Sequence, residues 1–461
     1  MSGIGKLFAP DLAELIAEKR WDELRQTVGG FDASDAAEIV ADLPRDAAVT
    51  LFRILPRETA GAVFAQLPAS SQEELLTGLT GGDADYLIRA LTPDDQARLL
   101  DELPAEVTRR ILDAIPPAEL QAARDLLGYP HGTAGRVMTP RYVALKPDWT
   151  AGQALDHVRR TARSAESVDL LYVLEKGRLT AELSLAALVV ADPAARLDSL
   201  PTRHLVTVAA TMTQGDVVQT FAKYDRPALP VVDGTGQLLG IITADDVLDV
   251  AQEQATESMQ RLGGTEALDQ PYLDVSFRGM LKKRGGWLSV LFFGEMLTAT
   301  AMGYFQGELE KAVVLAMFVP LIISSGGNSG SQSATLLVRS LALTEVRLRD
   351  WWRVLLIELR TGITLGTWLG MLGFVRIVAW QKLGLFDYGE FFVEVGVTVW
   401  VSLVGVVLFG SVVGSMLPFL LRKCGFDPAT SSAPFVATLV DVSGLVIYFV
   451  VASLVLAGKS L

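Results

Sequence analysis

Polar residues occupy the centre of a long apolar run near the C-terminal end of this 461-residue sequence. Residues 320–336 read PLIISSGGNSGSQSATL inside the apolar run 312–343, so amides and hydroxyls lie where a lipid-facing helix would carry apolar side chains. Backbone groups freed by Pro320 and by the pair Gly326-Gly327 need partners, so the segment should be buried in protein or line a watery path. Interrupted helices of this kind hold ions at membrane depth. A small-residue face that packs against another helix is the alternative.

A single carboxylate lies inside the last apolar run. Asp441 is about a third of the way along residues 433–457, and no basic residue follows it within the run. Burying a charge at this depth is costly, and an ionisable residue inside a membrane marks an ion pathway by default. Three other acidic residues in apolar runs are weaker candidates: Glu295, Glu358 and Glu394.

The elements that must position these residues are five apolar runs, each long enough to cross a membrane. They cover residues 287–305, 312–341, 354–380, 391–421 and 433–457. Basic residues gather before the first run, after the second and after the fourth. The positive-inside rule therefore predicts a cytoplasmic N-terminal half and an outside C-terminus. The first residues lack a secretory signal pattern, in agreement with that orientation.

Charge divides the chain into two parts. Residues 1–280 carry 26 Lys/Arg against 42 Asp/Glu, whereas the rest carry 14 against 11. An acidic half joined to an apolar half favours cations as partners and argues against nucleic acid. The three histidines, His131, His157 and His204, all precede the apolar runs, so a soft transition-metal site in the membrane is not expected. The one cysteine, Cys424, allows no internal disulfide and is expected to fill space.

The first 130 residues contain a repeat of 12 residues. Its signature pairs begin with Leu43-Pro44 and continue with 55–56, 67–68, 79–80, 91–92, 103–104 and 115–116. Each unit predicts a short helix, and short helices must stack to bury their apolar faces, so a small superhelix is expected. Asp94 and Asp95 lie at the start of one such helix. Capping by Thr92 and attraction to the positive helix end explain them as well as cation sensing does.

Residues 131–250 contain an imperfect duplication. In each half a strand, a turn and a second strand lead to a helix that begins near Ser184 or Thr243. The two halves resemble a tandem pair of CBS modules, a regulatory α/β fold that often binds adenine nucleotides. The stretch 243–246, TADD, is similar to the ribose-binding pattern, whereas the first module has SLAA at 184–187 and lacks the Asp.

An acidic helical face follows. Asp246, Asp249, Glu253 and Glu257 recur at helical spacing, and a connecting helix over 251–284 is expected to reach the basic residues 282–284. A solvated surface is the ordinary explanation of such a face. The remaining residues, 285–461, form the predicted transmembrane domain, so the chain is a multidomain membrane protein with an all-α N domain, a CBS pair and five α-helical spans.

The membrane motifs PLIISSGGNSGSQSAT and ATLVDVSG, at 320–335 and 437–444, resemble the MgtE family of magnesium channels. The resemblance covers nearly the whole chain. It implies a homodimer whose pore lies on the two-fold axis between the second and fifth spans. It also implies that Asp441 selects the ion, that Asn328 is a pore-lining amide, and that the backbone at Ala437 is a further hydrogen-bonding group. Mg²⁺ usually keeps several waters and uses one or two carboxylates, which agrees with that assignment.

The resemblance further implies that cytoplasmic Mg²⁺ closes the pore by binding acidic residues of the N domain, CBS pair and connecting helix. Matching positions here are Asp94, Asp95, Asp225, Asp246 and Asp249. Two departures from the family concern the nucleotide. Ala186-Ala187 replaces an Arg-Asp pair, and Arg226-Pro227 follows Tyr224-Asp225 where the family has an aromatic residue. ATP binding is therefore doubtful.

These patterns together predict a magnesium-selective channel for Mg²⁺ influx in the lipid of the cell (inner) membrane, closed by cytoplasmic Mg²⁺. An ion-coupled secondary transporter of divalent cations is the alternative, and selectivity among Mg²⁺, Co²⁺, Ni²⁺ and Ca²⁺ is left open. A membrane protease built on the GNSG motif at 327–330 is rejected because no histidine base follows His204. No enzymatic activity is expected.

Overall fold

The computed structural model describes residues 4–79, 81–103, 105–116, 120–268, 272, 275–305, 313–343 and 345–456. The chain divides into two compact units, Met1–Glu253 and Gln254–Leu461.

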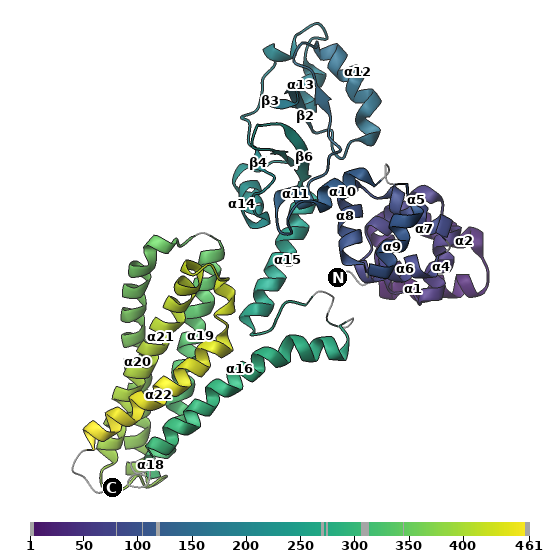
Figure 1. Ribbon diagram of the computed structural model, residues 1–461. Coiled ribbons are helices and arrows are strands. Elements are labelled where there is room, and N and C mark those ends of the chain that lie inside the picture. Colours follow the sequence, from purple (N-terminus) through teal and green to yellow (C-terminus); the bar gives the residue numbers. More distant parts are fainter. Residues whose placement is uncertain are drawn as a thin grey trace. The chain divides into compact units, whose positions relative to one another are not determined.

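Short stacked helices form the N-terminal part of the first unit (Figure 1). They are α1 (Ile4–Ala17), α2 (Trp21–Gly29), α3 (Ala33–Ala41), α4 (Arg45–Ile54), α5 (Arg57–Ala65), α6 (Ala69–Gly78), α7 (Gly81–Ala90), α8 (Pro93–Glu102), α9 (Ala105–Ala114) and α10 (Gln121–Leu127). From α4 to α9 the first residues fall 12 apart, which confirms the repeat. Alternate helices pack together, α1 on α3, α3 on α5 and α5 on α7, as a superhelix requires. Thr80 and Pro104 of the repeat lie outside the described residues.

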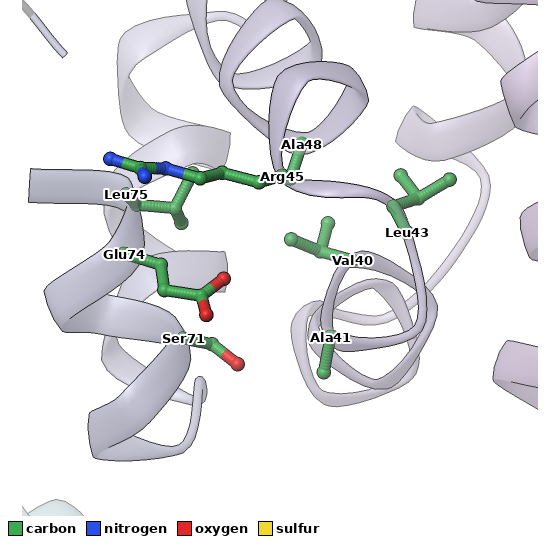
Figure 2. Close-up of a pocket in the computed structure, with 8 residues that line it drawn as sticks. All are labelled: Val40, Ala41, Leu43, Arg45, Ala48, Ser71, Glu74 and Leu75. Carbon is green, nitrogen blue, oxygen red and sulfur yellow. The ribbon is translucent and has the colours of Figure 1, made fainter. Parts of the chain in front are cut away.

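Figure 2 shows a small cavity in this superhelix, between the α3–α4 corner and α6. Its volume is about 20 Å³, enough for about one water. The Arg45 side chain at its rim donates a hydrogen bond to Thr77 Oγ1 at 2.8 Å. The cavity is therefore a packing feature of the superhelix.

Two matching α/β modules complete the first unit. Helix α11 (Ala134–Val137) comes first in the sequence but packs against the second module. The first module contains β1 (Ala144–Leu145), α12 (Ala151–Thr161), η1 (Ala162–Ser164), β2 (Leu170–Glu175), β3 (Arg178–Ser184), α13 (Leu185–Val190) and η2 (Leu197–Ser199). The second contains β4 (Val208–Ala209), α14 (Gln214–Tyr224), β5 (Ala228–Val232), β6 (Leu238–Thr243) and α15 (Ala244–Leu262). In each sheet a parallel pair is followed by an antiparallel pair, so the duplication is confirmed.

The connecting segment differs from the expected single helix over 251–284. Helix α15 ends at Leu262, and Gly264 adopts a left-handed φ of 74° just beyond it, which is a common way to end a helix. A new helix, α16 (Phe277–Tyr304), begins after Ser276, whose side chain caps it, and this second helix contains residues 282–284. The Gly263-Gly264 pair thus divides the segment.

The second unit continues with α18 (Val313–Ala316), α19 (Val319–Ala342), η3 (Leu348–Asp350), α20 (Trp351–Lys382), α21 (Phe392–Lys423), η4 (Pro428–Thr430) and α22 (Ala433–Val455). Among the described residues, four helical segments are long and apolar enough to cross a membrane: Val314–Ala342, Leu348–Lys382, Phe392–Lys423 and Ala433–Val455. They form the bundle α19–α22 in Figure 1.

The first predicted span, 287–305, is not among these four. It forms the second half of α16, but Glu295, Thr298 and Thr300 dilute its apolar content. Five spans are therefore not confirmed. Large apolar side chains are nevertheless exposed along this half of α16: Leu288, Val290, Phe292, Phe293, Met296 and Leu297.

Candidate functional site

The polar segment 320–336 lies within one continuous helix, α19, so the predicted interruption inside it is wrong. Pro320 falls in the first turn, where a missing N–H breaks no helical hydrogen bond. The actual interruption precedes it, as a turn at residues 317–318 between α18 and α19. Gly326 and Gly327 keep helical geometry. Because they have no side chains, neighbouring helices can approach their backbone closely.

The buried face of α19 is a small-residue packing face, as the alternative predicted. Gly326 and Gly330 lie against Gly410 and Gly414 of α21, and a methyl group on Gly414 would overlap the backbone carbonyl of Gly330. Ser329 Oγ and Ser411 Oγ share a hydrogen bond of 2.7 Å at the same interface. Close backbone approach and a buried polar pair therefore hold α19 to α21.

Replacing Gly414 by alanine should loosen this contact. The added methyl group meets backbone rather than a flexible side chain, so the cost should reach the upper end of the roughly 1–3 kcal/mol typical of overpacked sites. Gly303→Ala is the matched control, because a methyl group there meets no atom within 4 Å. Thermal unfolding of the full chain in detergent should show a lower midpoint for Gly414→Ala only. Equal midpoints would contradict the packing role.

The opposite face of α19 is polar and exposed. Ser324, Asn328 and Gln332 follow one another at intervals of four residues, and Thr335 continues the stripe. Asn328 and Gln332 are exposed within a segment that is long and apolar enough to cross a membrane. Exposed amides at membrane depth require water or protein beside them. This polar stripe, defined as residues 324, 328, 332 and 335, therefore faces a water path or a second polypeptide.

Asp441 lies half-buried on α22, beside the start of that stripe. A methyl group on Gly327 would lie 3.5 Å from Ala437 Cβ and 3.9 Å from Asp441 Oδ1, so α19 and α22 are adjacent at this level. One turn further along α19, Ser331 Oγ donates to the carbonyl of Ala433 at 3.1 Å. The fold thus brings Asp441 and Ala437 next to the helical turn that carries Asn328.

Two further carboxylates have defined surroundings. Glu295 of α16 interacts electrostatically with Asp441, which places a second negative charge near the first. Glu358 of α20 accepts a hydrogen bond from Ser333 Oγ at 2.8 Å and so ties α20 to α19. From the sequence alone, both residues were weak candidates. The helix packing shows that their surroundings differ, because Glu295 lies near Asp441 whereas Glu358 accepts a hydrogen bond from Ser333.

A second acidic site lies in the first unit, where α8, the segment after α10 and α15 enclose a cavity of about 310 Å³. Its acidic and basic lining residues are Asp94, Asp95, Arg98, Asp101, His131, Arg136, Asp246, Asp249 and Glu253. Four of the five predicted sensor residues line this acidic pocket. Asp225 does not, and instead ends α14 with a left-handed φ of 48°. Sequence reasoning missed Asp101, although it lies two helical turns after Asp94.

Burial dominates the electrostatics of this acidic pocket. It raises the pKa of Asp246 to about 7, with Asp94 and Asp245 adding to the effect, while the hydrogen bond from Thr243 Oγ1 at 2.6 Å opposes it. Burial and the charge of Asp95 also raise the pKa of Asp94. Glu166 does not line the pocket but interacts with Asp94, and its pKa is raised to about 7 by burial and then by Asp94.

Arginines offset only part of this charge. Arg98 lies 2.9 Å from Asp95 and 3.6 Å from Asp249, and Arg136 lies 2.6 Å from Asp101. The Thr92 hydroxyl caps α8 as the alternative predicted: its Oγ1 accepts a hydrogen bond from the Asp95 N–H at 3.4 Å and donates one to Asp95 Oδ2 at 3.0 Å. Asp249 also agrees with the solvated-face alternative, since its side chain is 71% exposed. Neither alternative explains why Asp94 and Asp246 are held half-buried, where burial raises the pKa of both carboxyl groups.

A divalent cation fits the pocket carboxylates that the arginines do not neutralise. Asp94 Oδ1 is buried and has no hydrogen-bond partner within the described part of the chain. Among the described residues no cluster of three or more His, Cys, Asp or Glu side chains is arranged to hold a metal ion. Mg²⁺ does not need one, because it keeps several waters and takes one or two carboxylates directly. The acidic pocket has room for such a hydrated ion.

The raised pKa of Asp246 predicts how pH changes stability without Mg²⁺. An unfolded Asp titrates near 4, so between about pH 4 and 7 the folded state binds more protons than the unfolded state. The free energy of unfolding should therefore fall as pH rises through that window, by on the order of 2–4 kcal/mol. Thermal unfolding at pH 5.5 and 8 measures this loss, and Mg²⁺ should restore stability at pH 8. An Asp246→Asn variant with the same pH dependence would contradict it.

Comparison with known proteins identifies the family of this chain. Three family models match: a divalent cation transporter over residues 319–451, the MgtE intracellular N domain over 31–132, and the CBS domain over 197–253. The chain is 42% identical to the magnesium transporter MgtE of Thermus thermophilus over 353 residues, which is 74% of this chain and 76% of that protein.

Two solved structures each match about half of this chain. The soluble part of a magnesium transporter is 24% identical, covers 54% of this chain and 99% of that chain, and has a TM-score of 0.51, which indicates a shared fold. The cytosolic domain of the Mg²⁺ channel MgtE, solved in complex with ATP, is 33% identical and covers 52% of this chain and 99% of that chain, with a TM-score of 0.49.

Proposed function

The chain belongs to the MgtE family, and from that premise we propose that it is a magnesium-selective channel for Mg²⁺ influx. The observation that carries the proposal is the placement of Asp441 beside the polar stripe of α19. One carboxylate and a row of amides and hydroxyls at membrane depth suit an ion that moves with its water shell.

The proposed pore lies between two copies of the chain. The polar stripe is exposed in a single copy, and a two-fold axis along it would face the stripe with its own equivalent. Two Asp441 carboxylates would then lie across the axis, with Asn328 and the backbone at Ala437 close by. Such a site binds hydrated Mg²⁺ through its waters. It also releases the ion fast enough to conduct, because it does not strip the ion bare.

Cytoplasmic Mg²⁺ is proposed to close this channel by binding the acidic pocket. With Mg²⁺ bound, Asp94 and Asp246 are both satisfied, and α8 stays against α15. Without it, the repulsion among the buried carboxylates separates the two and favours the open state. This feedback works only if the ion binds the closed state better than the open one.

The proposed orientation has the N-terminus in the cytoplasm and the C-terminus outside, in the cell (inner) membrane. It requires an odd number of spans, so α16 must be the fifth. The apolar side chains exposed on α16 support that assignment, since lipid or protein would cover them. None of the comparisons supports the doubt about ATP, and that doubt stays a prediction.

Reconstituted liposomes test the function. Purified full-length protein is placed in liposomes that contain a magnesium-sensitive dye, and external Mg²⁺ is added. Rapid uptake without a proton gradient supports a channel. Uptake that keeps a fixed ion-to-proton stoichiometry favours the secondary transporter. Adding Co²⁺, Ni²⁺ or Ca²⁺ in place of Mg²⁺ measures selectivity. No flux of any divalent ion through folded protein would overturn the proposal.

A further inference from the structure

A large apolar groove opens on the surface of the second unit, away from Asp441. Residues of η3, the first turns of α20 and the last turns of α21 enclose about 900 Å³, near the upper limit of the roughly 300–1,000 Å³ usual for ligand sites. Leu355, Val413 and Met416 are among the apolar side chains that line it. Phe419 is buried there, whereas Trp351 is half exposed at the same end as η3.

Two cations lie at one end of this groove. Arg349 of η3 and Lys423, the last residue of α21, both line it and are both exposed. Within the described part of the chain neither makes an ion pair, and the groove has no acidic lining residue. Helices α20 and α21 are both long and apolar enough to cross a membrane, and both cations stand at their ends. The basic end of the groove is therefore at headgroup level and the apolar part lies along the hydrocarbon.

We propose that this groove binds an anionic phospholipid, with the phosphate between Arg349 and Lys423 and an acyl chain along Leu355, Val413 and Met416. Charge complementarity selects this occupant, because basic pockets between membrane helices at headgroup level suit anionic lipids. The half-exposed Trp351 suits the same level, since tryptophan favours the membrane–water interface. The groove lies on α20 and α21, and α21 packs directly against α19, so a bound lipid would support one wall of the proposed pore.

Native mass spectrometry of the delipidated full-length protein tests the proposal. Phosphatidylglycerol and phosphatidylcholine with identical acyl chains are titrated separately, and bound lipids and protomers are counted. We expect phosphatidylglycerol to bind in preference. The double variant Arg349→Gln/Lys423→Gln should lower the affinity for phosphatidylglycerol by roughly 30-fold, the effect of two basic side chains at an anionic surface. Its affinity for phosphatidylcholine should not change.

Two further variants separate the possible causes. Lys282→Gln/Arg284→Gln removes the same charge from α16, outside the groove, and should leave lipid binding unchanged. Val413→Phe fills the groove and should weaken both lipids without altering any charge. Displacement of the lipid by free glycerol phosphate would mean that the site holds only a phosphate. A groove variant that changes the number of protomers instead of bound lipids would identify a second copy as the occupant. Either result, or equal binding by the two double variants, overturns the proposal.

Discussion

Replacing Asp441 by alanine should reduce Mg²⁺ flux by roughly 100-fold or more while the protein still folds and dimerises. Hydrogen bonds to a charged group contribute about 1.5–3 kcal/mol each. A two-fold pore loses one such carboxylate from each copy, so the combined loss is at least about 3 kcal/mol, or two powers of ten in ion occupancy. The fold should persist because the Asp441 carboxylate makes no hydrogen bond within the described part of the chain, and the Asp441–Glu295 repulsion disappears.

The measurement is dye-reported Mg²⁺ uptake into liposomes at equal protein density. Ser443→Ala is the matched control, since it removes a polar group from the same helix without removing charge. Ser443→Ala should retain most of the flux. Wild-type uptake through Asp441→Ala would remove Asp441 from the ion path. Size-exclusion chromatography of the same preparation distinguishes a loss of flux through folded protein from a loss caused by aggregation.

The sequence was sufficient to locate the membrane residues but not their geometry. Apolar runs and the isolated carboxylate are local patterns, so Asp441 and Asn328 could be identified without coordinates. From the sequence, the glycines of this segment could either break the helix or allow close contact with another helix. Only the position of the neighbouring helix distinguishes the two possibilities. Because Gly410 and Gly414 of α21 lie opposite, Gly326 and Gly330 are packing residues in an unbroken helix.

The acidic pocket shows where local patterns stop. Helical spacing put Asp246, Asp249 and Glu253 on one face, and that face indeed lines the pocket. Asp101 lies on α8 with Asp94, two helical turns away, and that spacing was the one local signal for it. Glu166 lies outside the pocket lining, and nothing in its neighbouring residues signals its interaction with Asp94. Asp225 is the reverse case. It was predicted as a sensor residue from a matching position in the family, but in a single copy of the chain it lies outside the pocket. Side-chain burial, which the sequence does not report, separates Asp246 from its solvated neighbours.

Replacing Asp94, Asp246 and Asp249 together by asparagine should leave the proposed channel open at millimolar internal Mg²⁺, where we expect the native protein to be closed. Amides bind Mg²⁺ weakly and do not repel one another. The substitutions therefore reduce both the stabilisation of the closed state by bound Mg²⁺ and the carboxylate repulsion that favours the open state. Loss of the ion dominates, because coupling between linked sites is typically about 1–3 kcal/mol. The Mg²⁺ concentration for half closure should therefore rise between about 5- and 150-fold.

Patch-clamp recording with controlled internal Mg²⁺ gives that concentration directly. The matched control is Glu58→Gln/Asp148→Asn/Glu175→Gln, which removes the same charge from exposed positions of the first unit that do not line the acidic pocket. If general repulsion of the acidic half sets the gate, both triple variants shift equally. If the acidic pocket holds the ion, only the pocket variant shifts, and Asp225→Asn alone reports whether a further site forms between two copies. Half closure of the pocket variant at the native concentration would mean that Asp94 and Asp246 take no part in sensing Mg²⁺.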